Sequence, residues 1–202
     1  MKTLHSHMMN KLFLTTLLIT LSFPVFSQDT LGTEVLGKKE QRKLEREHKF
    51  SEKQADEAQS REITQQLVKN QRFILEADYV ADRYGMKYPV TSLLNFIRID
   101  STNAIIQLGS NTGLGYNGVG GITVEGRVTK YKLSEKQNKK GTSYTITAYV
   151  TSSLGTYDLQ FWVSQLGNAD AAVRGNFPGS VTFTGHLVPI EESRVYKGTT
   201  TP

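Results

Sequence analysis

The side chains best suited to chemistry in this chain lie at alternating positions of short β-strand patterns. Every second residue of GITVEGRVTKYKL, SYTITAYVTS, YDLQFWVS and SVTFTGHLVPI is polar, charged or aromatic, so these residues share one face of a predicted sheet. The candidate ligand-binding residues on this face are Glu125, Arg127, Tyr149, Asp158, Trp162 and His186. Such a row is typical of a solvated outer face, of a face covered by a helix, or of a concavity that binds a ligand.

Two of these residues raise the question of an enzyme. Asp158 and Glu125 lie on the same predicted face, and two carboxyl groups about 5–9 Å apart can cleave glycosides. Acidic residues on strands are most often solvated surface groups. The sequence therefore favours a protein without catalytic residues, and a carboxylate-based hydrolase is the least favoured alternative.

Few residues of this chain could bind a metal ion or act as an activated nucleophile. The chain has no cysteine, and the histidines beyond the first ten residues are His48 and His186, which lie far apart in the sequence. A zinc site needs a cluster of such ligands, and neither histidine lies near a nucleophile elbow. We expect no metal and no cofactor.

A glycine-rich segment forms the clearest local motif. Seven of the 17 glycines fall between Gly109 and Gly126, and GLGYNG matches the G-x-G-x-x-G pattern. A dinucleotide site requires a helix after that pattern, whereas an alternating strand follows here. Asn117 and Gly118 indicate a tight turn. Asn117 is a further candidate ligand-binding residue, because a backbone nest here would bind an anion; a purely structural turn is the alternative.

The first 27 residues have the layout of a secretory signal peptide. Lys11 precedes the apolar run LFLTTLLITLSFPVF, and a polar change follows at Ser27 and Gln28. The run is shorter than the about 20 apolar residues of a membrane span. We expect cleavage near Ser27, a periplasmic or secreted product and no transmembrane segment in the mature chain. Without cysteine, that product has neither disulfides nor a lipoprotein anchor.

The charge pattern disfavours nucleic acid as a partner. The formal net charge is +5, and Lys2 and Lys11 of the signal region contribute two of these charges. The remaining basic residues are spread along the chain rather than clustered on one face, which a nucleic-acid interface requires.

A charged helix is predicted over residues 39–70, after a linker at 28–38. Glu and Lys recur within four residues, as in solvated helices. Ser51 and Gln54 fit a capping box, which allows a break or a second start near Ser51. Helical spacing places one apolar face on Ala55, Gln59, Ile63 and Leu67. No apolar heptad is sustained, so a coiled-coil dimer is disfavoured.

Residues 71–202 are predicted to form an antiparallel β domain. About eight short alternating patterns follow one another with short turns between them and no helical pattern, so the fold class is mainly β: an antiparallel meander forming a barrel or a curved sandwich. The predicted turns are 100–103, 137–141, 153–155 and 176–179. The predicted core face carries Ile122, Val124, Val128, Tyr144, Ile146, Ala148, Val150, Tyr157, Leu159, Phe161, Val163, Val181, Phe183 and Leu187.

Several blocks of this domain resemble a known family. They are FILEAD at 73–78, NFIRID at 95–100, IQLGS at 106–110, NGVGGITVEGRVTKY at 117–131, GTYDLQFWVS at 155–164 and FTGHLVPIEESRVYKG at 183–198. Together they resemble domain-of-unknown-function family 4251, exported proteins of the Bacteroidota. The resemblance implies an envelope protein with a charged lead-in, and it implies no catalytic residues.

These observations lead to two functional hypotheses besides the hydrolase. The first is a non-enzymatic periplasmic binding or accessory domain, with a small amphipathic ligand or glycan held against the concave side of the sheet. The second is a structural or protein-interaction module of the cell envelope, in which the charged helix reaches a partner while the β domain anchors it.

Overall fold

The computed structural model describes residues 37–110, 115–139, 141–175 and 180–202. The predicted signal peptide at 1–27, most of the linker and the turn at 176–179 lie outside the described residues. No helix in the described ranges is long and apolar enough to cross a membrane. The elements are α1 (Lys38–Asn70), β1 (Arg72–Ala81), β2 (Lys87–Pro89), β3 (Phe96–Asp100), β4 (Asn103–Leu108), β5 (Ile122–Asn138), β6 (Gly141–Ser152), β7 (Gly155–Ser164), β8 (Asn168–Arg174) and β9 (Ser180–Val188).

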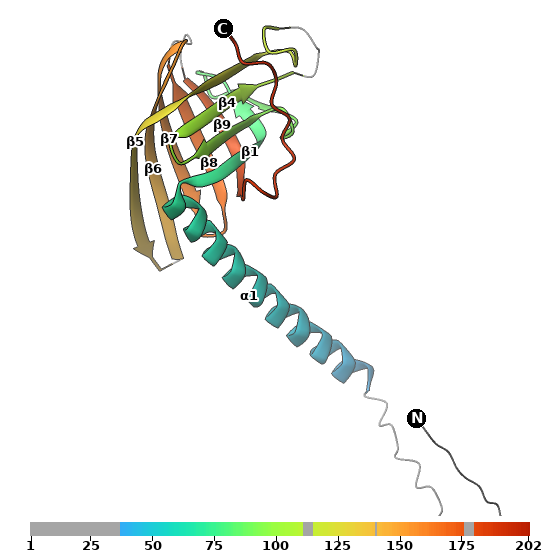
Figure 1. Cartoon of the computed structure of the whole chain (residues 1–202). Helices are drawn as coiled ribbons and strands as arrows, with labels where there is room; N and C mark the ends of the chain where they lie inside the picture. The colour runs from blue at the N-terminus through green and yellow to red at the C-terminus, as the bar shows by residue number, and fades with distance from the viewer. Residues whose placement is uncertain (1–36, 111–114, 140, 176–179) are drawn as a thin grey trace, which may run out of the picture. The chain divides into compact units, whose positions relative to one another are not determined.

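The strands form a closed antiparallel barrel (Figure 1). Strands β3 to β9 pair in sequence order, β1 pairs with β3 on one side and with β9 on the other, and β2 adds a short ninth strand to β1. The predicted fold class, mainly β and antiparallel, is confirmed, and of the two predicted shapes the barrel is the one observed. The predicted turns at 100–103, 137–141 and 153–155 coincide with the β3–β4, β5–β6 and β6–β7 connections.

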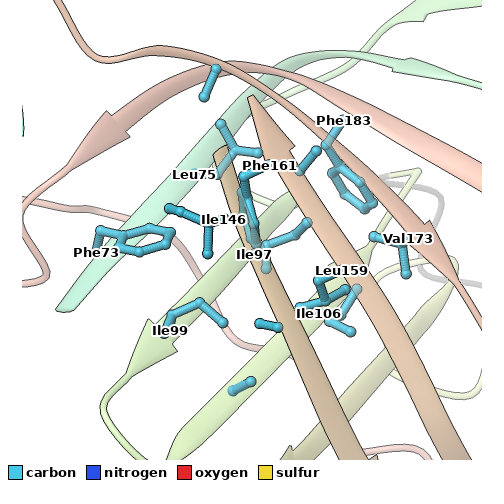
Figure 2. Close-up of a cluster of buried hydrophobic side chains, with 14 of the residues drawn as sticks. Phe73, Leu75, Ile97, Ile99, Ile106, Ile146, Leu159, Phe161, Val173 and Phe183 are labelled. Atoms are coloured by element: carbon cyan, nitrogen blue, oxygen red, sulfur yellow. The ribbon is translucent and has the colours of Figure 1, made fainter. Parts of the chain in front are cut away.

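Alternating apolar side chains fill the interior of the barrel. Figure 2 shows Phe73, Phe161 and Phe183 among aliphatic side chains from strands all around the sheet. The rings of Phe73 and Phe161 meet edge to face, with centroids 5.5 Å apart. The predicted core face is confirmed, with Ile122, Val128 and Val181 partly buried at its margins. An eight-stranded barrel is just wide enough for side chains to fill it, so the interior is a core.

Helix α1 runs without interruption through Ser51. The predicted break or second helix start at this residue was wrong. The Ser51 hydroxyl donates to the carbonyl of His48, three residues earlier, at 2.8 Å, so the side chain bonds within the helix and caps nothing.

The last two turns of α1 dock on the barrel through a face shifted by one residue from the predicted one. Thr64 and Val68 are the buried residues of the helix, while Ile63 and Leu67 are only partly buried. Val68 belongs to the barrel core, and the Tyr131 hydroxyl donates to its carbonyl at 2.7 Å. Burial raises the pKa of Tyr131, which keeps this hydroxyl a donor.

The segment after β9 crosses the outside of the barrel over β1, β3 and β4 (dark red in Figure 1). Ile74, Phe96 and Ile105 point outward from these strands, yet they are at most 8% exposed. Val188, Ile190 and Val195 cover them and form a second, smaller apolar cluster. The sequence patterns did not predict this outer layer.

Two polar side chains beneath the same segment are completely buried. Gln107 and Thr123 lie opposite each other on β4 and β5 and are 0% exposed. The Gln107 amide nitrogen donates to the Tyr196 carbonyl at 2.8 Å, and its carbonyl oxygen accepts from the Gly198 amide at 2.8 Å and the Thr123 hydroxyl at 2.9 Å. Gln107 therefore fixes the C-terminal segment by the hydrogen bonds that buried amides require.

Closure of the barrel leaves no room for a side chain at Gly185, which pairs with Ala77 across β1 and β9. A Cβ there would lie 1.9 Å from the Glu76 carbonyl oxygen. We expect Gly185→Ala to lower the free energy of unfolding by about 3 kcal/mol, because backbone would have to move. Urea denaturation measures this change. Gly37→Ala, where nothing lies within 4 Å, is the control; equal stability of the two variants would contradict this description of the closure.

We expect Gln107→Ala to lower the free energy of unfolding by about 3 kcal/mol, because it leaves buried backbone groups of the C-terminal segment unpaired. It should also speed proteolysis of the chain after Val188, since the segment then detaches more often. Denaturation and limited proteolysis with mass spectrometry test both effects. The exposed Gln54→Ala is the matched control. A Gln107 variant as stable as this control would show that Gln107 does not hold the C-terminal segment in place.

Candidate functional site

An open hollow of about 620 Å³ lies on the outer face of the barrel, where β6 to β9 meet β1. Three other hollows on the described part of the surface are smaller, with volumes of about 250, 380 and 320 Å³. Its lining mixes aromatic rings, hydroxyls, an amide and carboxylates: Asp78, Tyr79, Ser143, Tyr144, Thr145, Trp162, Val163, Ser164, Asn168, Ala169, Asp170, Thr184 and Gly185.

One row of paired residues forms the floor of this hollow. Thr145 lies opposite Trp162 across β6 and β7, and Trp162 lies opposite Asp170 on β8. Asp170 pairs with Thr184 on β9, which pairs with Tyr79 on β1. Directly opposed residues in adjacent strands lie about 5 Å apart. The row therefore presents two aromatic residues, 44% and 47% exposed, with a carboxylate and a hydroxyl between them.

A β-bulge brings a second carboxylate to the rim. The register of β1 against β9 shifts between Ala77 and Tyr79, and Asp78 is the extra residue. Its carboxylate lies 3.7 Å from Nδ1 of His186, whose Nε2 lies 3.9 Å from the carboxylate of Glu76. His186 thus stands beside the hollow, between two acidic residues.

Some polar groups of the hollow already form hydrogen bonds within the protein, and one does not. The Asp170 carboxylate accepts a 2.6 Å hydrogen bond from the Thr184 hydroxyl. The Ser164 hydroxyl oxygen is buried and has no hydrogen-bond partner in the described part of the chain. A buried polar atom without a partner is costly, and a bound group could satisfy this oxygen only after the Ser164 side chain rotates toward the hollow.

The structure places the sequence-predicted residues in several parts of the barrel. Trp162 lies in the hollow and His186 beside it. Tyr149 and Asp158 face each other across β6 and β7, four residues along β7 from Trp162, and Lys130 lies 5.5 Å from the Tyr149 ring centroid. All of these lie on the convex outer face. The expected concave placement was wrong, because the concave side of the sheet is the apolar core.

Glu125 lies on a different side of the barrel, where its exposed side chain meets the C-terminal segment. It accepts hydrogen bonds from Lys197 at 2.5 Å and Thr200 at 3.0 Å, and these bonds hold the pKa of its carboxyl below the ordinary value. The Arg127 side chain is exposed two residues further along β5, opposite Thr151 of β6. Glu125 therefore stabilises the C-terminal segment.

The predicted carboxylate pair is not assembled. Asp158 pairs with Tyr149, which pairs with Lys130, five residues beyond Glu125 on β5. Two strand spacings alone separate Asp158 from β5 by about 10 Å, before this offset along the strand is added. Glu125 and Asp158 cannot flank one glycosidic bond.

Asn117 is 1% exposed and organises the turn of the glycine-rich segment. Its amide donates to the Leu108 carbonyl and the Thr123 hydroxyl, and its side-chain oxygen accepts from the amides of Val119 and Gly121. The structural alternative accounts for all of these contacts, because the amides of Val119 and Gly121 point at Asn117.

The sequence patterns missed most of the hollow. Tyr79 and Asp78 belong to β1, which meets β9 only when the barrel closes, whereas Asp170 and Thr184 lie on the consecutive strands β8 and β9. The outward position of Asp170 in the alternating segment ADAAVR was a usable signal, whereas the bulge that places Asp78 leaves no mark in the sequence. In the described ranges, no group of three His, Asp or Glu residues is arranged to hold a metal ion.

Comparison with known proteins identifies relatives of the domain but gives no activity. A family model described as a domain of unknown function, DUF4251, matches residues 55–187, from the second half of α1 to the end of β9. A crystal structure of a DUF4251 family protein from Bacteroides eggerthii is 29% identical, with a TM-score of 0.57, and the match covers 69% of this chain and 94% of that one. No curated protein matches.

The family match spans well over half of the chain, and the solved relative shares its fold. It begins earlier than the resemblance seen in the sequence, because it includes the part of α1 that docks on the barrel, and it ends before the C-terminal segment. The chain belongs to the DUF4251 family.

Proposed function

We propose that this protein is a non-enzymatic binding domain of the periplasm, which holds a small amphipathic ligand or glycan in the outer hollow around Trp162. The observation that carries the proposal is the hollow itself, which places Trp162 and Tyr79 on either side of Asp170 and Thr184. Export to the periplasm rests on the apolar run of the first 27 residues.

The position of the ligand follows from how the barrel is filled. Side chains occupy the interior, so a ligand has to bind on the outside. The hollow of about 620 Å³ falls within the roughly 300–1,000 Å³ usual for small-molecule sites. It also mixes apolar surface with a few directional polar groups, which is the composition of such sites.

The chemistry of the lining suits a ligand with one apolar and one polar side. The exposed Trp162 ring offers a flat apolar surface for a sugar ring or a hydrocarbon group. Asp170, Thr184, Asn168 and Ser164 offer donors and acceptors around it. Binding through these contacts needs no covalent step.

We expect Trp162→Ala to lose a ligand that the wild-type protein retains, because the variant removes the main apolar contact. Native mass spectrometry of protein purified from its own periplasm measures the retained mass. Phe50→Ala, which removes an aromatic residue 64% exposed on α1, should keep the ligand. Wild-type protein that carries no added mass and binds no member of a glycan and lipid panel would refute the proposal.

A second candidate function is a protein-interaction module that uses α1. Leu44 and Phe50 are large apolar residues on the helix, 48% and 64% exposed, and each of the residues 43–56 is exposed. Single exposed apolar residues are common. A 14-residue stretch that contributes nothing to the core is nevertheless available to a partner in the cell envelope.

If this second function is correct, a chain that begins at Ser51 should keep its melting temperature and lose an envelope partner. The removed residues that the structure describes, 37–50, are all exposed, so the barrel should stay intact. Crosslinking in intact cells followed by affinity purification compares the two chains. Equal capture of the same partner by the shortened chain would exclude α1 as the interaction site.

A further inference from the structure

We propose that the group bound in the outer hollow is an organic cation, a primary ammonium or a guanidinium carried by the amphipathic ligand. This inference rests on the proposed binding function and names the chemical class of the ligand. It follows from three features of the hollow: its charge, the neighbourhood of Trp162 and Asp170, and the unpartnered hydroxyl of Ser164.

The hollow is acidic although the chain as a whole is basic. Asp78 and Asp170 line it, and no Lys or Arg is among its lining residues, whereas the chain carries a formal net charge of +5. His186 stands between Asp78 and Glu76 at the rim. Asp170 has no such basic neighbour, since it makes no ion pair within the described ranges, and Thr184 is its hydrogen-bond partner. Its negative charge therefore faces the hollow without a counter-charge.

Trp162 and Asp170 are placed to act on one cation together. They lie directly opposite each other on β7 and β8, where side chains of paired residues stand about 5 Å apart. A cation over the indole face is attracted by the ring, and the same cation can form a charge-assisted hydrogen bond with the carboxylate. A neutral hydroxyl in the same place would gain neither the ring interaction nor the ion pair.

Ser164 supplies a further contact for the same group. It follows Trp162 by two residues on the outward side of β7, and its buried hydroxyl oxygen has no partner in the part of the chain that the structure describes. A primary ammonium carries three hydrogen-bond donors. One donor can satisfy Asp170, and another can satisfy Ser164 once its hydroxyl rotates out of the buried position, which removes the cost of the unpaired oxygen.

The chain contains a single tryptophan, so its intrinsic fluorescence reports directly from the hollow. We would titrate the full mature chain with phenylbutylamine and with phenylbutanol, its neutral counterpart of the same shape. We expect the amine to bind about tenfold more tightly, the combined effect of one ion pair and one cation–π contact. Added salt should weaken the amine and leave the alcohol unchanged, because only the amine is held by charge.

The variant Asp170→Asn should abolish the difference between the two probes while leaving the binding of phenylbutanol intact. Asp56→Asn, which removes the same charge from an exposed position on α1, should preserve the difference. Circular dichroism and thermal melting show whether each variant is folded. If Asp170→Asn does not fold, Asp78→Asn takes its place, and a several-fold smaller preference for the amine is expected.

Two further probes separate the sources of such a cation. Spermidine represents free polyamines, and Nα-acetyl-lysine-methylamide, whose side-chain ammonium is free, represents a basic side chain of a peptide. The probe that binds more tightly identifies the source of the cation. Equal affinity for phenylbutylamine and phenylbutanol would contradict the proposal that the bound group is a cation, but it would not contradict the proposed binding function. If neither probe binds, the proposal of a cationic group is also contradicted. Native mass spectrometry of the purified protein then tests the binding function separately.

Discussion

The pairing of β1 with β9 is the contact on which the rest of the structure depends. It joins the first long strand of the domain to the last and thereby turns a meander into a barrel. The two backbones run without a side chain at Gly185, whose Cα faces the carbonyl of Glu76. The same pairing brings Tyr79 and Asp78 beside Thr184 and creates the outer hollow. Closure thus produces both the apolar core and the candidate site.

The outer surface of the barrel is divided between two roles. On β1, β3, β4 and β5 the C-terminal segment covers apolar residues and the buried amide of Gln107, so this side is used for stability. On β6 to β9 nothing in the described ranges covers the polar and aromatic rows, and the hollow lies there. Glu125 and Trp162 have similar surroundings in the sequence pattern and both are exposed, but the C-terminal segment forms hydrogen bonds with Glu125.

The sequence was sufficient where a residue's environment follows from its neighbours along the chain. Alternation predicted that Ile146, Ala148 and Phe161 face the core, and glycine and polar clusters predicted the hairpin turns. It failed where the environment depends on distant segments. Gln107 has the outward position of a solvated residue, and it is buried because residues about 90 positions later fold over it. Trp162 was predicted as a site residue, whereas Tyr79 joins its row only when β1 pairs with β9.

A binding site on the outside of a filled barrel imposes its own limits on a ligand. An open hollow cannot enclose a small molecule as a lipocalin-like cavity does, so less apolar area is removed from water. Affinity then depends on the few strong contacts at the floor, which here are an aromatic ring and an unneutralised carboxylate. The same openness lets the remainder of a ligand extend past the rim. A terminal group of a larger molecule therefore fits this geometry better than a molecule that must be fully buried.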